Sequence, residues 1–170
     1  MALSGTILAV SAFAELTQAL DLGSGRAPQQ LSRKMSLGSG TGAGKADRVF
    51  SDRRTLAASA TEDLDLAGVL TDAFGTAITF ARIKGLIVAA AAANTNNVVV
   101  GAASSNAWAT LLGATHTLTL RPGAFVAVGT GEADATGYAV TAGTGDLLKI
   151  ANSAGGTSVS YDIHIIGASA

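Results

Sequence analysis

A strict alternation of apolar and polar side chains towards the end of this chain constrains its fold more than any other feature. Val159, Tyr161, Ile163 and Ile165 take every second position, and serine, aspartate and histidine take the positions between them. A period of two residues is typical of a β-strand with one buried and one solvated face. Residues 157–166 are therefore predicted to form a strand whose polar side chains lie on the outer surface of a sheet.

Short apolar segments separated by glycine-containing turns recur through most of the chain. Extended segments are predicted at residues 47–60, 61–66, 79–88, 98–100, 116–120, 124–128, 138–141 and 146–151. One helical turn is expected at 106–112 with Asn106 as its N-cap, and a hairpin loop at 153–156 between the last two strands. Short strands at even spacing predict an all-β fold, a single antiparallel β-sandwich that is jelly-roll-like, with an extended N-terminal segment.

The first 45 residues are predicted to be distinct from a β-sandwich domain at 46–170. Residues 5–22 fit a helical stripe through Phe13, Leu16 and Leu20, but they also fit alternation. We favour a strand closed near residues 23–25, with a second short strand at 30–37 and a flexible Gly-rich loop at 38–44. The segment is expected to be either an extra strand pair or an arm that reaches a neighbouring subunit.

The composition limits the classes of partner and of chemistry. The net charge is −1 and no long basic run occurs, so no binding of nucleic acid is expected. There are no cysteines, which excludes disulfides and thiolate chemistry. Residues 2–16 lack the basic start of a signal peptide, and residues 86–93 are too short to cross a membrane. Only 14% of residues are charged, against about 25% in a typical soluble domain, so the surface suits packing against other subunits.

The candidate chemical motifs are weak, and we predict no catalytic, cofactor-binding or metal-binding residues and no enzyme activity. Gly44-Lys45 resembles the end of a phosphate-binding loop, but Ser39 and Ala46 stand where that motif needs Gly and Ser or Thr, and Ala43 breaks the dinucleotide pattern. No serine lies in the spacing of a nucleophile elbow.

The other candidate ligands are two histidines and two acidic clusters. His116 and His164 have no partner in a ligand spacing, so both are predicted to be exposed strand residues. Two sets of carboxylates, Glu62 with Asp63 and Asp65, and Glu132 with Asp134, lack a calcium-loop pattern and are expected at solvated edges and turns. The lone Trp108, beside Leu111 and Leu112, is predicted to be core.

Five segments carry a resemblance to a known family: residues 54–68, 94–101, 121–123, 134–148 and 161–167. These strings are turn and strand patterns rather than catalytic motifs. Over residues 46–170 the chain resembles small structural proteins of tailed bacteriophages. The resemblance implies a β-sandwich component of the virion, with capsid decoration, head fibre and tail part as the positions that such proteins occupy.

This resemblance implies a non-enzymatic protein that decorates or cements the outer capsid shell and is assembled in the host cytoplasm. Its expected partners are the major capsid protein and further copies of itself, as a homo-oligomer for which a trimer is one option. The N-terminal segment is the candidate capsid contact, because the Gly-rich loop at 38–44 is predicted to be a flexible hinge that joins it to the sandwich. The alternative is a tail or head-fibre module that binds host surface glycans through exposed Tyr138, Tyr161 and Trp108.

Overall fold

The computed structural model describes residues 3–170, and within that range the chain is built from β-strands without helices. The predicted all-β sandwich class is confirmed. The strands are β1 (Thr6–Leu20), β2 (Gly23–Ser39), β3 (Lys45–Ala46), β4 (Arg48–Leu56), β5 (Thr61–Asp65), β6 (Arg82–Ala90), β7 (Val98–Gly101), β8 (Thr117–Leu120), β9 (Phe125–Gly129), β10 (Tyr138–Ala139), β11 (Leu147–Asn152) and β12 (Val159–Ala168). No helix in the described range is long and apolar enough to cross a membrane.

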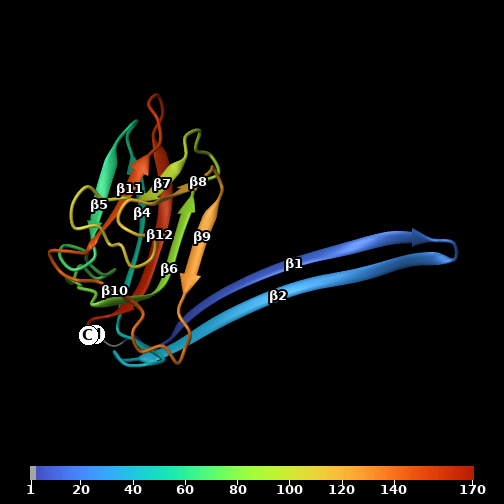
Figure 1. Cartoon of the computed structure of the whole chain (residues 1–170), viewed down its shortest axis with the longest axis horizontal. Coiled ribbons are helices and arrows are strands. Elements are labelled where there is room, and N and C mark those ends of the chain that lie inside the picture. Colours follow the sequence, from blue (N-terminus) through green and yellow to red (C-terminus); the bar gives the residue numbers. More distant parts are fainter. Residues whose placement is uncertain (1–2) are drawn as a thin grey trace.

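Two sheets form the sandwich, and a long two-stranded hairpin leaves it at one end (Figure 1). The first sheet has the order β10-β6-β12-β4, with β9 also paired to β6, and the second has the order β5-β11-β7-β8. The chain crosses between the sheets at most of its connections, so neighbouring strands in a sheet, except β7 and β8, are not consecutive in sequence. The third sheet is the hairpin of β1 and β2, with the short β3 beside its root.

The sandwich core lies between the two sheets and is made largely of aliphatic side chains. The predicted buried side of β12 is confirmed, because Val159, Tyr161, Ile163 and Ile165 are each at most 2% exposed. Burying such a side chain stabilises a fold by about 2 kcal/mol. Trp108 also lies in this core, where its indole Nε1 donates to the Ala139 carbonyl at 2.9 Å.

The other side of β12 is not uniformly solvated. Asp162 is exposed, but Ile166 is 2% exposed and belongs to a second, smaller cluster with Leu8, Met35 and Leu37 of the hairpin. The ladder between β6 and β12 carries an irregularity at Ile166/Gly167. The expected outer surface of the sheet is therefore partly covered by the root of the hairpin.

Two local predictions are wrong. Residues 153–156 do not join a hairpin, because β11 pairs with β5 and β7, whereas β12 pairs with β4 and β6 in the opposite sheet. Asn106 is not an N-cap, because its φ of 47° is left-handed and the segment is irregular. A single turn forms later, where the Gly113 N–H donates to the Ala109 carbonyl at 2.8 Å.

Candidate functional site

The hairpin of β1 and β2 is exposed over most of its length. Its strands pair without a break from Thr6↔Leu37 to Leu20↔Gly23, and Asp21 and Leu22 form the turn. The turn therefore lies before the glycines at 23–25, which were expected to close the strand. In Figure 1 the hairpin extends far beyond the sandwich. The second strand is much longer than the predicted 30–37.

One side of the hairpin, here called the apolar side, carries most of its large aliphatic residues. Residues that alternate along β1 and their partners on β2 share this side. Beyond the root its apolar members are Val10, Ala12, Ala14, Leu16 and Leu20 from β1, with Leu31 and Ala27 from β2, and its polar members are Gln18, Gln29 and Arg33. Leu16 is 68% exposed and Leu31 is 57% exposed. Two-stranded ribbons are marginally stable alone, so an exposed apolar side indicates a contact surface.

The opposite side of the hairpin is mixed in character. It carries Ile7 and Phe13, which are 62% and 66% exposed, next to polar and charged residues. Glu15 and Arg26 form an ion pair at 2.6 Å on this side. An exposed pair of this kind contributes little to stability, but it keeps this side more soluble than the apolar side.

A small cluster at the root anchors the hairpin to the sandwich. Leu8, Met35 and Leu37 are between 4% and 7% exposed and pack with Ala46 and Ile166. They lie over glycines of the sheet: a Cβ built on Gly85 would stand 3.1 Å from Leu8 Cδ1 and 3.3 Å from Met35 Cε. The missing side chain is what allows the hairpin to approach so closely.

The loop at residues 38–44 is held in place rather than free, which corrects the expectation of a flexible hinge. The Gly38 N–H donates to the Gly44 carbonyl at 2.8 Å, and the Gly40 N–H donates to the Ala46 carbonyl at 3.1 Å. These amides are occupied, so they do not form the cradle that a phosphate-binding loop needs.

Lys84 adds a further constraint on this loop. Its side chain is 0% exposed, and its ammonium donates to the carbonyl of Gly42. Burial, and after it the charge of Arg82, lowers the pKa of Lys84. A buried ammonium needs a hydrogen-bond acceptor, so this contact ties the loop to β6.

The acidic residues near the hairpin root act within the fold. Glu132 Oε1 accepts the backbone N–H of Ser36 at 2.7 Å, which links the hairpin to the loop after β9. Asp134 accepts the N–H groups of Gly137 and Thr136, and these bonds lower the pKa of its carboxyl group. Both carboxylates therefore have structural partners.

The second acidic cluster is also divided among structural contacts. Glu62 accepts the Tyr161 hydroxyl at 2.6 Å and the Arg54 guanidinium at 2.7 Å. Burial and the Glu62 bond raise the pKa of Tyr161. Asp63 is exposed, and Asp65 accepts the Ala67 N–H. Glu62 lies on the opposite side of β5 from Asp63 and Asp65, so the three carboxylates do not converge. Among residues 3–170 no group of three or more His, Asp or Glu side chains could hold a metal ion.

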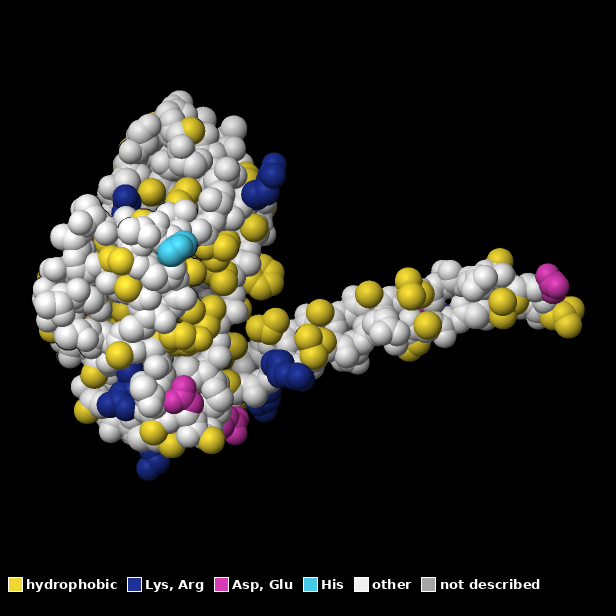
Figure 2. Space-filling model, viewed as in Figure 1, with side chains coloured by type: hydrophobic (Ala, Val, Ile, Leu, Met, Phe, Trp, Pro, Cys, Tyr) yellow, Lys and Arg dark blue, Asp and Glu magenta, His cyan; other side chains and the backbone are white. Residues whose placement is uncertain are grey.

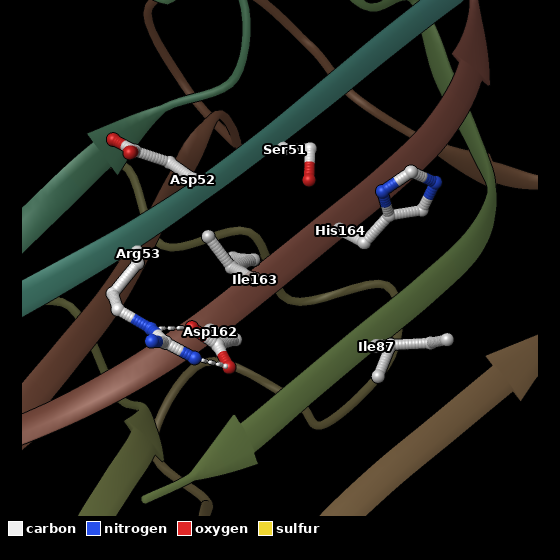
Figure 3. A pocket seen from close by; sticks show the side chains of 7 residues that line it. All are labelled: Ser51, Asp52, Arg53, Ile87, Asp162, Ile163 and His164. Atoms are coloured by element: carbon white, nitrogen blue, oxygen red, sulfur yellow. Dashed lines mark hydrogen bonds and ion pairs between the residues drawn. The ribbon is translucent and has the colours of Figure 1, made fainter.

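The two histidines lie on different sheets. His116 is exposed, as predicted, but it lies just before β8 rather than within the strand. The prediction of exposure is wrong for His164, which is half-buried on the outer face of β12, and this burial lowers its pKa. It sits between Ser51 of β4 and Ile87 of β6 in one row across three strands (Figure 3).

The row with His164 lines an open hollow of ≈ 530 Å³. Its wall comprises Ser51, Asp52, Arg53, Ile87, Asp162, Ile163 and His164. The Arg53 guanidinium makes two bonds to the Asp162 carboxylate, at 2.6 and 2.8 Å, drawn as dashed lines in Figure 3. Asp52 pairs at 3.1 Å with Arg54, which lies outside the wall. Each charged group of the hollow therefore has a partner, and the remaining wall is neutral and partly apolar.

The aromatic residues expected in a glycan groove lie elsewhere. Tyr161 is 1% exposed and Trp108 is 5% exposed, and both belong to the core. Tyr138 is half-buried against Trp108, with ring centroids 6.3 Å apart in an edge-to-face arrangement. The three side chains proposed for the glycan-binding alternative are thus not presented in an open groove.

Comparison with protein-family models, with curated proteins and with solved structures gives no match for this chain.

Sequence reasoning missed Lys84 and the apolar outer face of the first sheet. That face includes Ile87 and Ala89 of β6 with Phe125 and Ala127 of β9. A signal was present, because β6 reads Ile-Lys-Gly-Leu-Ile-Val-Ala-Ala and β9 reads Phe-Val-Ala-Val, with apolar residues at nearly every position. Such runs are typical of strands covered on both faces.

Proposed function

We propose that this chain is a non-enzymatic structural protein of a tailed-bacteriophage virion. In this proposal it decorates or cements the outer capsid shell, and its partners are the major capsid protein and other copies of itself. The hairpin is the element that contacts the shell. The observation that carries the proposal is the hairpin itself, a long and paired ribbon whose large aliphatic residues remain uncovered.

The polar side chains of the sandwich support a structural role. Several groups that could perform acid, base or ligand chemistry are engaged in structural contacts, as with Glu62 and Tyr161 across the two sheets. A decoration protein acts through contact area, and a standard interface buries about 1,600 Å² in total. A rigid sandwich that carries an apolar ribbon suits that task, since the ribbon supplies area without requiring the core to rearrange.

The first test shortens the hairpin while keeping its root. Residues 11–32 are replaced by an Asn-Gly turn, so that Val10 and Arg33 become the closing pair. Val10 and Arg33 lie on the same side of the hairpin as Leu20 and Gly23, which close the natural turn, so the pairing pattern at the new turn is the same. Leu8, Met35 and Leu37 stay in place, so the anchor remains covered.

We expect the shortened protein to fold but to lose binding to capsids that lack it, measured by co-sedimentation. Thr119→Glu, an exposed substitution on β8, is the matched control and should bind as the unmodified protein does. Undiminished binding of the shortened protein would reject the hairpin as the shell contact.

Electron cryo-microscopy of the intact particle tests the location. Density for the sandwich on the shell lattice supports decoration. Density confined to the neck or tail would reject it in favour of a fibre or tail part.

A further inference from the structure

The apolar side of the hairpin is continuous with its buried root. The side that presents Leu8 and Met35 to the sandwich presents Val10, Ala12 and Leu31 at the next positions. Leu8 is 7% exposed, whereas Val10 is 38% exposed. The ribbon leaves the sandwich at this point, so its apolar side continues without a covering layer.

The outer face of the first sheet shows the complementary situation. Beside the row of Gly129, Gly85 and Ile166, in which Gly85 and Ile166 are buried, lies the row of Ala127, Ile87 and His164, followed by Phe125 and Ala89. We call five residues the outer shelf: Ile87, which packs at one edge against the root cluster, with Ala89, Phe125, Ala127 and His164. Phe125 is 63% exposed and the other four are half-buried. Figure 2 shows hydrophobic side chains gathered on the sandwich near the point where the hairpin leaves it.

The contact at the root shows that these two surfaces fit each other. Within one chain the hairpin's apolar side already packs on this sheet face, where a Cβ on Gly129 would stand 3.4 Å from Leu8 Cδ2. The next positions on the hairpin and the next row of the sheet are also largely apolar, but here the hairpin and the sheet diverge. Small residues on both surfaces permit a close approach of two flat layers.

We propose that the apolar side of the hairpin of one copy packs on the outer shelf of a second copy. The contact repeats between chains what the root does within one chain. Reciprocal exchange gives a dimer, and exchange around a ring gives a closed trimer.

The charges on both surfaces favour this contact. Beyond the root, Arg33 is the one charged residue on the apolar side in the described range, and it lies close to the sandwich. On the sheet, Arg53 and Asp162 already neutralise each other beside the shelf. Burial lowers the pKa of His164, which favours the neutral form of its ring. Docking of the apolar side beyond Arg33 therefore buries no unpaired charge, which would otherwise oppose it.

The hairpin supplies most of the area for this contact. Its apolar side is about 10 Å wide and runs about 30 Å from Val10 to Leu20, so it offers roughly 300 Å². The outer shelf covers only two rows of the sheet and is smaller, so reciprocal docking buries less than about 1,200 Å² in total, which places it among the smaller specific interfaces.

This inference goes beyond the proposed function and does not depend on it. The mixed side of the hairpin, with Ile7 and Phe13, stays uncovered in such an assembly and remains available to a shell. Self-association is measured on purified protein without capsids, so its failure and a failure of shell binding are separate results.

The first experiment measures mass by light scattering coupled to size-exclusion chromatography. We expect the unmodified protein to be a dimer or trimer. Leu16→Glu on the apolar side and Ile87→Glu on the shelf should each give monomers. The matched controls are Thr17→Glu, on the opposite side of the same strand, and Thr119→Glu, on the other sheet, and both should keep the unmodified mass.

The second experiment mixes two defective proteins. The hairpin-shortened protein keeps its shelf, and the Ile87→Glu protein keeps its hairpin. Each should be monomeric alone, whereas the mixture should form a 1:1 complex, because one intact hairpin meets one intact shelf.

Several results would overturn the proposal. A monomeric unmodified protein at high concentration would do so. So would an Ile87→Glu protein that keeps its assembly while Leu16→Glu loses it, because hairpins would then pack on each other. Monomers in the mixture of the two folded variants would also reject the pairing of hairpin with shelf.

Discussion

The last strand and the first hairpin both alternate apolar and polar side chains, but the apolar side is buried in the strand and exposed in the hairpin. In β12 the apolar positions face a second sheet, and Ile165 is 0% exposed. In β1 the corresponding side faces the sandwich only at Thr6 and Leu8, and Leu16 is 68% exposed. Alternation therefore indicates which residues share a side of a strand, and a second layer decides whether that side is buried.

The two regions also differ in what holds their strands in place. The sandwich sheets are joined by a filled core and by polar contacts across it, such as that of Tyr161 with Glu62. Over most of its length the hairpin has its own ladder of hydrogen bonds but no layer behind it. Its order beyond the root rests on local pairing, which is the weaker of the two sources of stability.

The largest expected effect on stability is the difference between shortening a side chain in the sandwich core and shortening one on the hairpin. Ile165→Ala should lower the free energy of unfolding by about 2–5 kcal/mol, because it leaves a cavity between the sheets. Phe13→Ala, which removes a larger but 66% exposed side chain, should change it by less than about 0.5 kcal/mol. Urea unfolding followed by tryptophan fluorescence measures both. Similar losses for the two variants would contradict the comparison.

The next effect concerns the polar contact across the sandwich. Glu62→Ala leaves the buried Tyr161 hydroxyl without its acceptor, so we expect a loss of about 1–3 kcal/mol. Asp63→Ala, at the neighbouring exposed position, is the control and should change stability by less than about 0.5 kcal/mol. An unchanged unfolding midpoint for Glu62→Ala would show that the contact between the sheets does not stabilise the fold.

A smaller and local effect is expected at the hairpin root. Lys84→Met keeps a long side chain under the loop but removes the bond to Gly42. The global unfolding midpoint should move little, whereas the amides of Gly38 and Gly40 should exchange with deuterium faster. Unchanged exchange at these two amides would mean that Lys84 does not hold the loop.

The smallest effect is a dependence on pH that arises from the outer face. Burial lowers the pKa of His164 below 6.5, so the folded chain binds fewer protons than the unfolded chain in the window just below pH 6.5. Stability should therefore fall as the pH falls through that window. The lowered carboxyl pKa values of Asp134 and Asp162 act only below about pH 4.

Unfolding midpoints at pH 7.5 and pH 5 measure this dependence, and His164→Gln should reduce it. If the substituted protein keeps the full difference between the two pH values, another group is responsible.

The sequence was most informative where local chemistry alone decides the structure. The turn at residues 121–123 forms as predicted, with the Ala124 N–H on the Arg121 carbonyl at 2.8 Å and Gly123 at a φ of 77°. The buried side of β12 was equally readable. Both depend on residues that are adjacent along the chain.

The sequence alone does not predict which strands pair with each other or which apolar residues are exposed. The loop at 153–156 looked like a hairpin because two strands flank it, but the partners of β12 lie at β4 and β6, far away in sequence. The hairpin of β1 and β2 was open to prediction as a strand pair, yet nothing local distinguishes an apolar residue that meets a second layer from one that does not. Lys84 was similarly hidden, because its acceptor is the carbonyl of Gly42.

The fixed root of the hairpin has a mechanical consequence. A ribbon with a rise of about 3.3 Å per residue over β1 places its turn roughly 50 Å from the root, so a tilt of only about 10° there moves the tip by roughly 9 Å. The hydrogen bonds of residues 38–44 and the ammonium of Lys84 act where the lever arm is shortest. Small changes at these few contacts would therefore decide the direction of the hairpin and the position of its tip relative to the sandwich.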